Sequence, residues 1–198
     1  MLVYGLLLVA AYLIGSIASA VLVCKIMGKQ DPRTEGSGNP GTTNVLRLHG
    51  KKAATLTLIG DALKGLIPVF LVRMTGAPDV LVVLVGLAAF TGHLFPVFFE
   101  FRGGKGVATF FGVLLGMHWL LGLSFAATWL AMAFLFRYSS LAALTAAILT
   151  PLYTIGLLPG TTFALVNAVM AGLLLWRHYA NIKNLLAGNE KKIGGSKV

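Results

Sequence analysis

Long apolar runs separated by short polar segments make up most of the chain. A helix needs about 20 apolar residues to cross a bilayer, and the apolar runs occupy residues 2–26, 53–74, 80–98, 107–136, 139–157 and 161–176. The uncharged run 107–136 would be about 45 Å long as one helix, so we predict a break near residues 116–119. The pattern therefore predicts an all-α integral membrane protein with seven transmembrane helices.

Composition and charge support this prediction. Hydrophobic residues make up 57% of the 198 residues and charged residues only 11%, so we expect one polytopic membrane domain over residues 1–198. Lys and Arg gather in residues 28–52, 102–105 and the tail from 177, which predicts an outside N-terminus and a cytoplasmic C-terminus. The net charge of +10 then indicates contact with anionic membrane lipid or substrate, and no nucleic acid.

The first polar segment reads Gly-Ser-Gly-Asn-Pro-Gly-Thr-Thr-Asn at residues 36–44 and is followed by Arg47. Glycines let backbone N–H groups approach an anion closely, and arginine can hold a phosphate with two parallel hydrogen bonds. We predict a phosphate site made by Ser37, Gly38, Asn39, Gly41, Thr42, Thr43, Asn44 and Arg47. The alternative is a solvated loop between two helices.

A second glycine-rich segment has a lysine at its centre. Gly103, Gly104 and Gly106 flank Lys105, and an uncharged run follows directly. Flexible backbone N–H groups, a cation and the start of a helix together favour an anion. We therefore predict a second anion site here.

Two ionisable residues lie deep inside the predicted second span. Asp61 and Lys64 are three residues apart and so share one helix face. Charged groups at this depth are costly and usually face the interior of the bundle. They form either a structural ion pair or a pair in which Lys64 contacts a substrate anion and Asp61 orients it.

The third motif opens the C-terminal tail. Continued as a helix from residue 177, the tail places His178 and Asn181 on one face. With seven spans, this motif and the two glycine-rich segments all fall on the cytoplasmic side of the membrane. We expect them to form a single site.

Several common catalytic arrangements are missing from the sequence. Cys24 is the only cysteine, no His/Cys cluster has metal-ligand spacing, and no histidine begins a His-x-x-x-x-Asp motif. We therefore expect no metal and no cofactor. What remains is a cationic pocket able to hold two phosphates and an acyl chain.

The three motifs, in this order, resemble the bacterial acyl-phosphate:glycerol-3-phosphate acyltransferases (PlsY type). Gly92-His93 with the following Phe-Pro-Val-Phe, and Gly188 with Glu190, belong to the matching segments. The resemblance implies transfer of a fatty acyl group from acyl phosphate to the sn-1 hydroxyl of glycerol 3-phosphate. The products are lysophosphatidic acid and inorganic phosphate, in the first step of phospholipid synthesis. It also implies a bacterial plasma (inner) membrane enzyme whose active site faces the cytoplasm.

The resemblance also implies residue roles. It assigns the 103–106 loop with Lys105 to glycerol 3-phosphate. We assign the first motif with Arg47 to the other phosphate and the forming oxyanion, and we expect catalytic roles for Ser37, Arg47, Lys105, His178 and Asn181. His178 either accepts the hydroxyl proton or holds a phosphate. The alternative function is a membrane transporter for a phosphorylated metabolite, although the polar residues crowd one face and form no path across the membrane.

Overall fold

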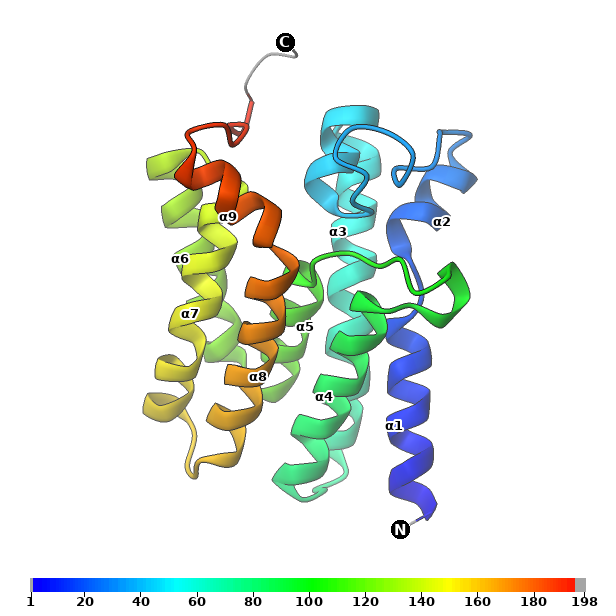
Figure 1. Ribbon diagram of the computed structural model, residues 1–198. Helices are drawn as coiled ribbons and strands as arrows, with labels where there is room; N and C mark the ends of the chain where they lie inside the picture. Colours follow the sequence, from blue (N-terminus) through cyan, green and yellow to red (C-terminus); the bar gives the residue numbers. More distant parts are fainter. Residues whose placement is uncertain (1, 195–198) are drawn as a thin grey trace. The chain divides into compact units, whose positions relative to one another are not determined.

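In the computed structural model, which describes residues 2–194, α-helices joined by loops make up the chain, and this range contains no strand (Figure 1). The chain divides after His118 into two compact units. Within the described range, four helices are long and apolar enough to cross a membrane, or up to six if each of two bent pairs is one span. The all-α fold is confirmed, whereas the seven-span count and the orientation of the termini stay predictions.

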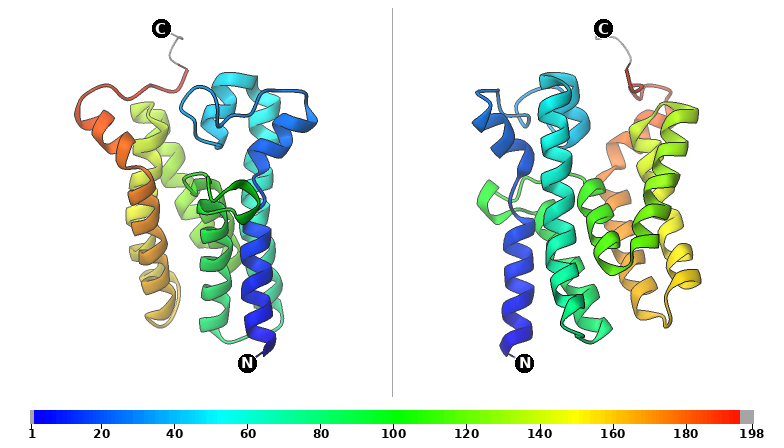
Figure 2. Two further views of the ribbon diagram at one scale, coloured as in Figure 1. Left: turned by 45° about the vertical axis from the view of Figure 1, so that its right-hand side comes forward. Right: turned by 180° about the vertical axis from the view of Figure 1, so that it is seen from behind.

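The first unit contains five α-helices and one short 3-10 helix. They are α1 (Leu2–Gly15), α2 (Ser19–Ile26), α3 (Thr42–Met74), α4 (Asp79–Leu94), η1 (Val97–Phe99) and α5 (Val107–Met117). Helix α3 packs against α2, α4 and α5, and α1 packs against α4. In all views the loop between α4 and α5 lies part way along α3, not at its end (Figure 2).

Glycines bring α3 and α5 close together. A Cβ atom at Gly112 would overlap the carbonyl oxygen of Ala62, and one at Gly65 would overlap that of Thr109. Small residues at such contacts let helix backbones approach in lipid, where van der Waals packing drives association. This close contact fixes α5 and the loop before it against α3.

The predicted first span, residues 2–26, is two helices and not one continuous helix, and the pair together can still make the single predicted crossing. Helix α1 ends at Gly15, α2 begins at Ser19, and their axes differ by 46°. The Ile17 carbonyl in the break accepts a hydrogen bond of 2.6 Å from Lys64 Nζ on α3. The Lys64 side chain therefore supplies the hydrogen bond that the Ile17 carbonyl lacks where the helix is interrupted.

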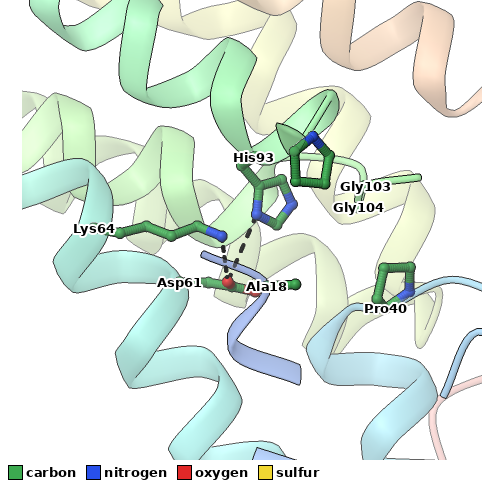
Figure 3. A pocket seen from close by; sticks show the side chains of 8 residues that line it. Ala18, Pro40, Asp61, Lys64, His93, Gly103 and Gly104 are labelled. Carbon is green, nitrogen blue, oxygen red and sulfur yellow. Dashed lines mark ion pairs between the residues drawn. The ribbon is translucent and has the colours of Figure 1, made fainter. Parts of the chain in front are cut away.

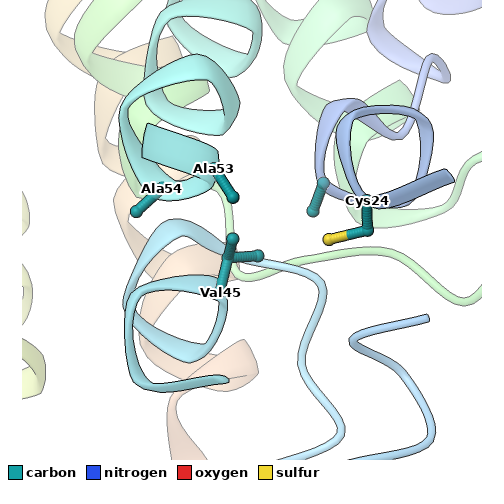
Figure 4. Close-up of a cluster of buried hydrophobic side chains, with 5 residues drawn as sticks. Cys24, Val45, Ala53 and Ala54 are labelled. Carbon is teal, nitrogen blue, oxygen red and sulfur yellow. The ribbon is translucent and has the colours of Figure 1, made fainter. Parts of the chain in front are cut away.

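Helix α3 begins earlier than predicted. Residues 42–52 were expected in a polar loop, but the helix starts at Thr42 and kinks at Gly50, whose φ is 83°. Apolar side chains on both sides of the kink pack against α2 in one buried cluster (Figure 4). The cluster comprises Ala20, Cys24, Val45, Ala53 and Ala54. This packing anchors the helical start that carries the end of the first motif.

The predicted break near residues 116–119 is present at His118, between α5 and α6. Helix α5 has only 11 residues, about 16 Å of helix. This is shorter than a hydrocarbon core of about 30 Å, so α5 is the one of the seven predicted spans that helix length supports least.

The second unit contains α6 (Trp119–Phe136), α7 (Ser139–Leu157), α8 (Thr162–Arg177) and α9 (Tyr179–Leu186). Helix α7 packs against both α6 and α8, and the buried Asn167 amide donates to Thr154 Oγ1 across the α7–α8 contact at 2.9 Å. Helices α8 and α9 meet at a bend of 62°. The expected continuous helix through His178 is therefore interrupted, as the change of direction into α9 shows (Figure 1).

Candidate active site

A buried amide organises the first glycine-rich loop. Asn44 is 2% exposed, and its Oδ1 accepts the Ser37 N–H at 3.0 Å. Its Nδ2 donates to the carbonyls of Pro32 at 2.9 Å and Glu35 at 3.2 Å. Gly36 has a φ of 64°, and a Cβ there would overlap Asn44 Oδ1. Asn44, expected to contact substrate, thus holds the backbone that presents Ser37.

The same loop is tied to the segment before the second motif. Arg33 donates to Asp31 Oδ2 from Nε at 3.0 Å and from its terminal nitrogen at 2.7 Å. This side-chain hydrogen bonding lowers the pKa of the Asp31 carboxyl and raises the pKa of the Arg33 guanidinium. The guanidinium carbon lies 5.6 Å from the centre of the Phe99 ring, within cation–π range. Arg33 therefore links the turn before the first glycine-rich segment to the segment before the second.

Three ionisable side chains meet inside the first unit. Asp61 and Lys64 come from α3 and His93 comes from the end of α4, and all are at most 6% exposed. Asp61 Oδ1 lies 2.9 Å from Lys64 Nζ and 3.6 Å from His93 Nδ1 (Figure 3). The structural ion pair is therefore present, and Lys64 also donates to the Ile17 carbonyl.

The second glycine-rich segment packs directly on His93. The Gly104 N–H donates to the His93 carbonyl at 3.2 Å. A Cβ at Gly103 would overlap that carbonyl oxygen, and a Cβ at Gly104 would overlap the imidazole Nε2. Gly106 has a φ of 91° and precedes α5, and it packs on the Phe90 ring. Only glycines allow the loop to approach α4 this closely, and they hold the half-buried Lys105 between them.

These segments meet around one small, partly open pocket in the first unit. Its lining comes from the α1–α2 break, the first motif, α3, the end of α4 and the second motif (Figure 3). The lining residues are Ala18, Pro40, Asp61, Lys64, His93, Pro96, Gly103 and Gly104. The structure therefore brings Lys64, Gly103 and Gly104 together beside the first motif. Ser37 and Arg47 are exposed.

In the second unit, His178 is 3% exposed at the bend between α8 and α9. Its Nδ1 lies 2.8 Å from the Leu174 carbonyl oxygen. Since a carbonyl can only accept, Nδ1 carries the hydrogen, and a neutral ring then has its lone pair on Nε2. This tautomer is the one that a proton acceptor at Nε2 requires.

Glu190 connects the third motif to the start of α7. Its Oε1 accepts hydrogen bonds from Asn181 Nδ2 at 2.8 Å and Ser140 Oγ at 2.6 Å. Asn181 is thereby held in place by a carboxylate nine residues further along the chain. The bond fixes the orientation of the Asn181 amide.

Sequence reasoning did not single out His93 or Glu190 as candidate site residues, and it gave Asp61 only a possible role in orienting Lys64 toward a substrate anion. His93 and Glu190 stood only within segments that matched the family, and Asp61 was considered only as a partner of Lys64. The sequence did carry a signal for each. His93 lies shortly before the second glycine-rich loop, Asp61 is a charged residue within a predicted span, and Glu190 follows the third motif. Among residues 2–194, no group of three or more His, Cys, Asp and Glu side chains could hold a metal ion.

Comparisons with known proteins agree on one family. The family model described as "Glycerol-3-phosphate acyltransferase" matches residues 5–188. A glycerol-3-phosphate acyltransferase of Burkholderia cenocepacia (strain HI2424) is 57% identical over 190 residues, covering 94% of this chain and 89% of the relative. One of Thioalkalivibrio sulfidiphilus is 53% identical over 194 residues, covering 98% and 96%.

Two solved structures are also similar to this chain. One is a crystal structure of PlsY (YgiH), an integral membrane glycerol 3-phosphate acyltransferase, in its glycerol 3-phosphate form. It is 38% identical with a TM-score of 0.91, and 96% of each chain is covered. The lysophosphatidic acid form is 37% identical with a TM-score of 0.89, covering 96% of this chain and 94% of the other.

Proposed function

Because the chain belongs to the glycerol-3-phosphate acyltransferase family, we propose that it transfers a fatty acyl group from acyl phosphate to the sn-1 hydroxyl of glycerol 3-phosphate. The products are lysophosphatidic acid and inorganic phosphate. The protein is a membrane protein, and we place it in the bacterial inner membrane with its site facing the cytoplasm. The excess of Lys and Arg in the predicted inner loops supports that orientation.

In the proposed reaction the sn-1 hydroxyl oxygen attacks the carbonyl carbon of the acyl phosphate. The new C–O ester bond forms, the bond from the carbonyl carbon to the phosphate oxygen breaks, and phosphate leaves with the electron pair. An acyl phosphate is a mixed anhydride with a good leaving group, so the enzyme needs no covalent nucleophile. Its main task is to hold two mutually repelling phosphates, which requires fixed cations and N–H donors.

Positioning should therefore supply more of the rate than proton transfer. Holding reactants in attack geometry can lower a barrier by about 7 to 11 kcal/mol. A general base typically gives about 10² to 10⁴-fold, or roughly 3 to 5 kcal/mol. Rigid loops and buried charges matter more to this enzyme than a single strong base.

The pocket in the first unit is the observation that carries the proposal. It brings Lys64, two glycines of the 103–106 loop and Pro40 of the first motif around one small concavity. We assign the 103–106 loop with Lys105 to glycerol 3-phosphate, and Lys64 to a substrate phosphate. We assign the first motif, with Ser37 and Arg47, to the other phosphate and the forming oxyanion.

The third motif handles the hydroxyl proton in this proposal. His178 has the tautomer suited to accept it at Nε2, and Asn181 is oriented by Glu190. The proton passes either to His178 or to a substrate phosphate, and because both groups titrate near neutrality, loss or retention of the pH-dependent step in His178→Ala separates the two routes. This part of the proposal rests on the sequence motifs and the local geometry of the second unit.

The donor is tested by offering the purified protein palmitoyl phosphate, palmitoyl-CoA and palmitoyl carrier protein in parallel with labelled glycerol 3-phosphate. We expect labelled lysophosphatidic acid and released phosphate with palmitoyl phosphate only. Equal turnover with palmitoyl-CoA would contradict the proposed donor. Uptake of labelled glycerol 3-phosphate into proteoliposomes without an acyl donor would instead favour a transporter.

A further inference from the structure

His93 is a buried polar side chain to which the proposed reaction gives no task. It is 6% exposed and lies in the last turn of α4. Placing a polar ring there costs free energy unless its nitrogen atoms have polar neighbours. The two ring nitrogens face different parts of the candidate site, and this arrangement indicates what the ring does.

The Nδ1 side of the ring faces α3. His93 Nδ1 lies 3.6 Å from Asp61 Oδ1, and the same carboxylate oxygen lies 2.9 Å from Lys64 Nζ. Lys64 is itself fixed by its hydrogen bond to the Ile17 carbonyl. The Nδ1 side of the imidazole therefore faces a buried ion pair of α3 whose lysine is also tied to the break between α1 and α2.

The Nε2 side of the ring faces the second glycine-rich loop. A Cβ on Gly104 would overlap Nε2 and would lie 2.8 Å from the ring carbon Cε1. The Gly104 N–H also donates to the His93 carbonyl. Gly104 is not among the residues of positive φ, so the ring itself, and not the backbone conformation, excludes a larger residue at this position.

We propose that His93 is a positioning residue: oriented by Asp61, its imidazole supports the Gly103–Gly104 backbone and thereby fixes Lys105 for binding glycerol 3-phosphate. The inference rests on the assignment of this loop to glycerol 3-phosphate under "Proposed function". In this proposal the imidazole is a spacer between the Asp61 carboxylate and the 103–106 loop. His93 itself transfers no proton.

The two ring nitrogens can be tested separately with amide side chains. His93→Gln places an amide near the Nε2 position and keeps the support behind Gly104. His93→Asn places one near Nδ1, facing Asp61, and leaves space behind Gly104. Under the proposal, His93→Gln keeps the KM for glycerol 3-phosphate within about threefold of wild type, whereas His93→Asn and His93→Ala raise it about tenfold or more, within the range of coupling between neighbouring residues.

Gly104→Ala provides the second half of the test. Alone, it should raise the same KM, because the new methyl group meets the imidazole. In the His93→Asn background the methyl group has space, so adding Gly104→Ala should change the KM less than twofold. In the His93→Gln background, Gly104→Ala should raise the KM for glycerol 3-phosphate as much as it does in wild type. Gly156→Ala is the matched control, since a Cβ there meets nothing within 4 Å.

All variants are made in the full chain and measured in detergent micelles by kinetics and by the thermal shift that glycerol 3-phosphate produces without donor. We expect the KM for the acyl donor to change less than threefold throughout, so the effect is specific to one substrate. Multiplicative effects of His93→Asn and Gly104→Ala, or equal losses for both substrates, would overturn the proposal. If His93→Ala does not fold, the Gln and Asn variants decide. A wild type that uses another acyl donor would refute the proposed donor and leave this test intact.

Discussion

The buried pair of Asp61 and Lys64 offers a prediction whose size follows from the structure. The two side chains are 3% and 5% exposed and 2.9 Å apart. Removing one partner of such a pair leaves an uncompensated buried charge and costs about 3–5 kcal/mol. We therefore expect Lys64→Met and Asp61→Asn each to lower the free energy of unfolding by that amount.

The double variant should be far more stable than the sum of the two single changes predicts. Independent effects would add to about 6–10 kcal/mol. With both charges removed, the main remaining loss is the hydrogen bond from Lys64 to the Ile17 carbonyl, and an unsatisfied buried acceptor costs about 1–3 kcal/mol. Asp61→Asn/Lys64→Met should thus recover most of the stability lost in the single variants.

The assay is equilibrium unfolding by SDS in mixed micelles, combined with turnover measurements. Because we assign Lys64 to a substrate phosphate, the double variant should be folded but have a raised KM. Lys51→Met is the control, since Lys51 is an exposed cation of the same helix. Additive destabilisation by the two single changes, or a fully stable Lys64→Met variant, would refute the reasoning from the buried pair. Full recovery of turnover in the double variant would reduce Lys64 to a structural role.

The remaining predictions concern the motifs and the helix packing. Lys105→Ala and Arg47→Ala should each abolish most turnover while the melting temperature stays near that of wild type, and near-normal activity in either would remove that residue from the site. His178→Ala should lower kcat by about 10²-fold or more if His178 is the base, and a wild-type pH–rate profile that is flat around neutrality would argue against that role. Gly112→Ala should destabilise the fold by about 1–3 kcal/mol, because its Cβ would overlap a carbonyl of α3. Gly156→Ala, with open space around its Cβ, should melt at or slightly above the wild-type temperature because alanine favours helix more than glycine does, and equal melting of these two glycine variants would contradict the packing argument.

Most of the helices could be predicted from the sequence, but their ends were less predictable. The break at His118 was correctly placed because one uncharged run was too long for the bilayer. The break at residues 16–18 was missed because the run is apolar apart from Ser16, Ser19 and Lys25, and two serines do not by themselves mark a helix end. What permits it is the ammonium of Lys64, 47 residues away, which no local pattern reveals.

The candidate site divides in the same way. Residue types predicted the glycine-rich loops and Lys105, because an anion site needs backbone N–H groups and cations. They did not predict that Asn44 would be buried in holding its own loop, or that His93 would support Gly104. Both roles depend on contacts between segments that are far apart in the sequence or joined by irregular turns.

The sequence by itself determined that this is a helical membrane protein with three polar motifs, since a bilayer requires long apolar runs and confines most charges to loops. Only the tertiary structure decided how buried polar groups are satisfied. Asp61, Lys64 and His93 are each costly alone in an apolar interior, and they are tolerated because folding brings Lys64 and His93 within 4 Å of the Asp61 carboxylate. That arrangement depends on the packing of α3 against α4, which hydrophobic periodicity in either helix does not specify.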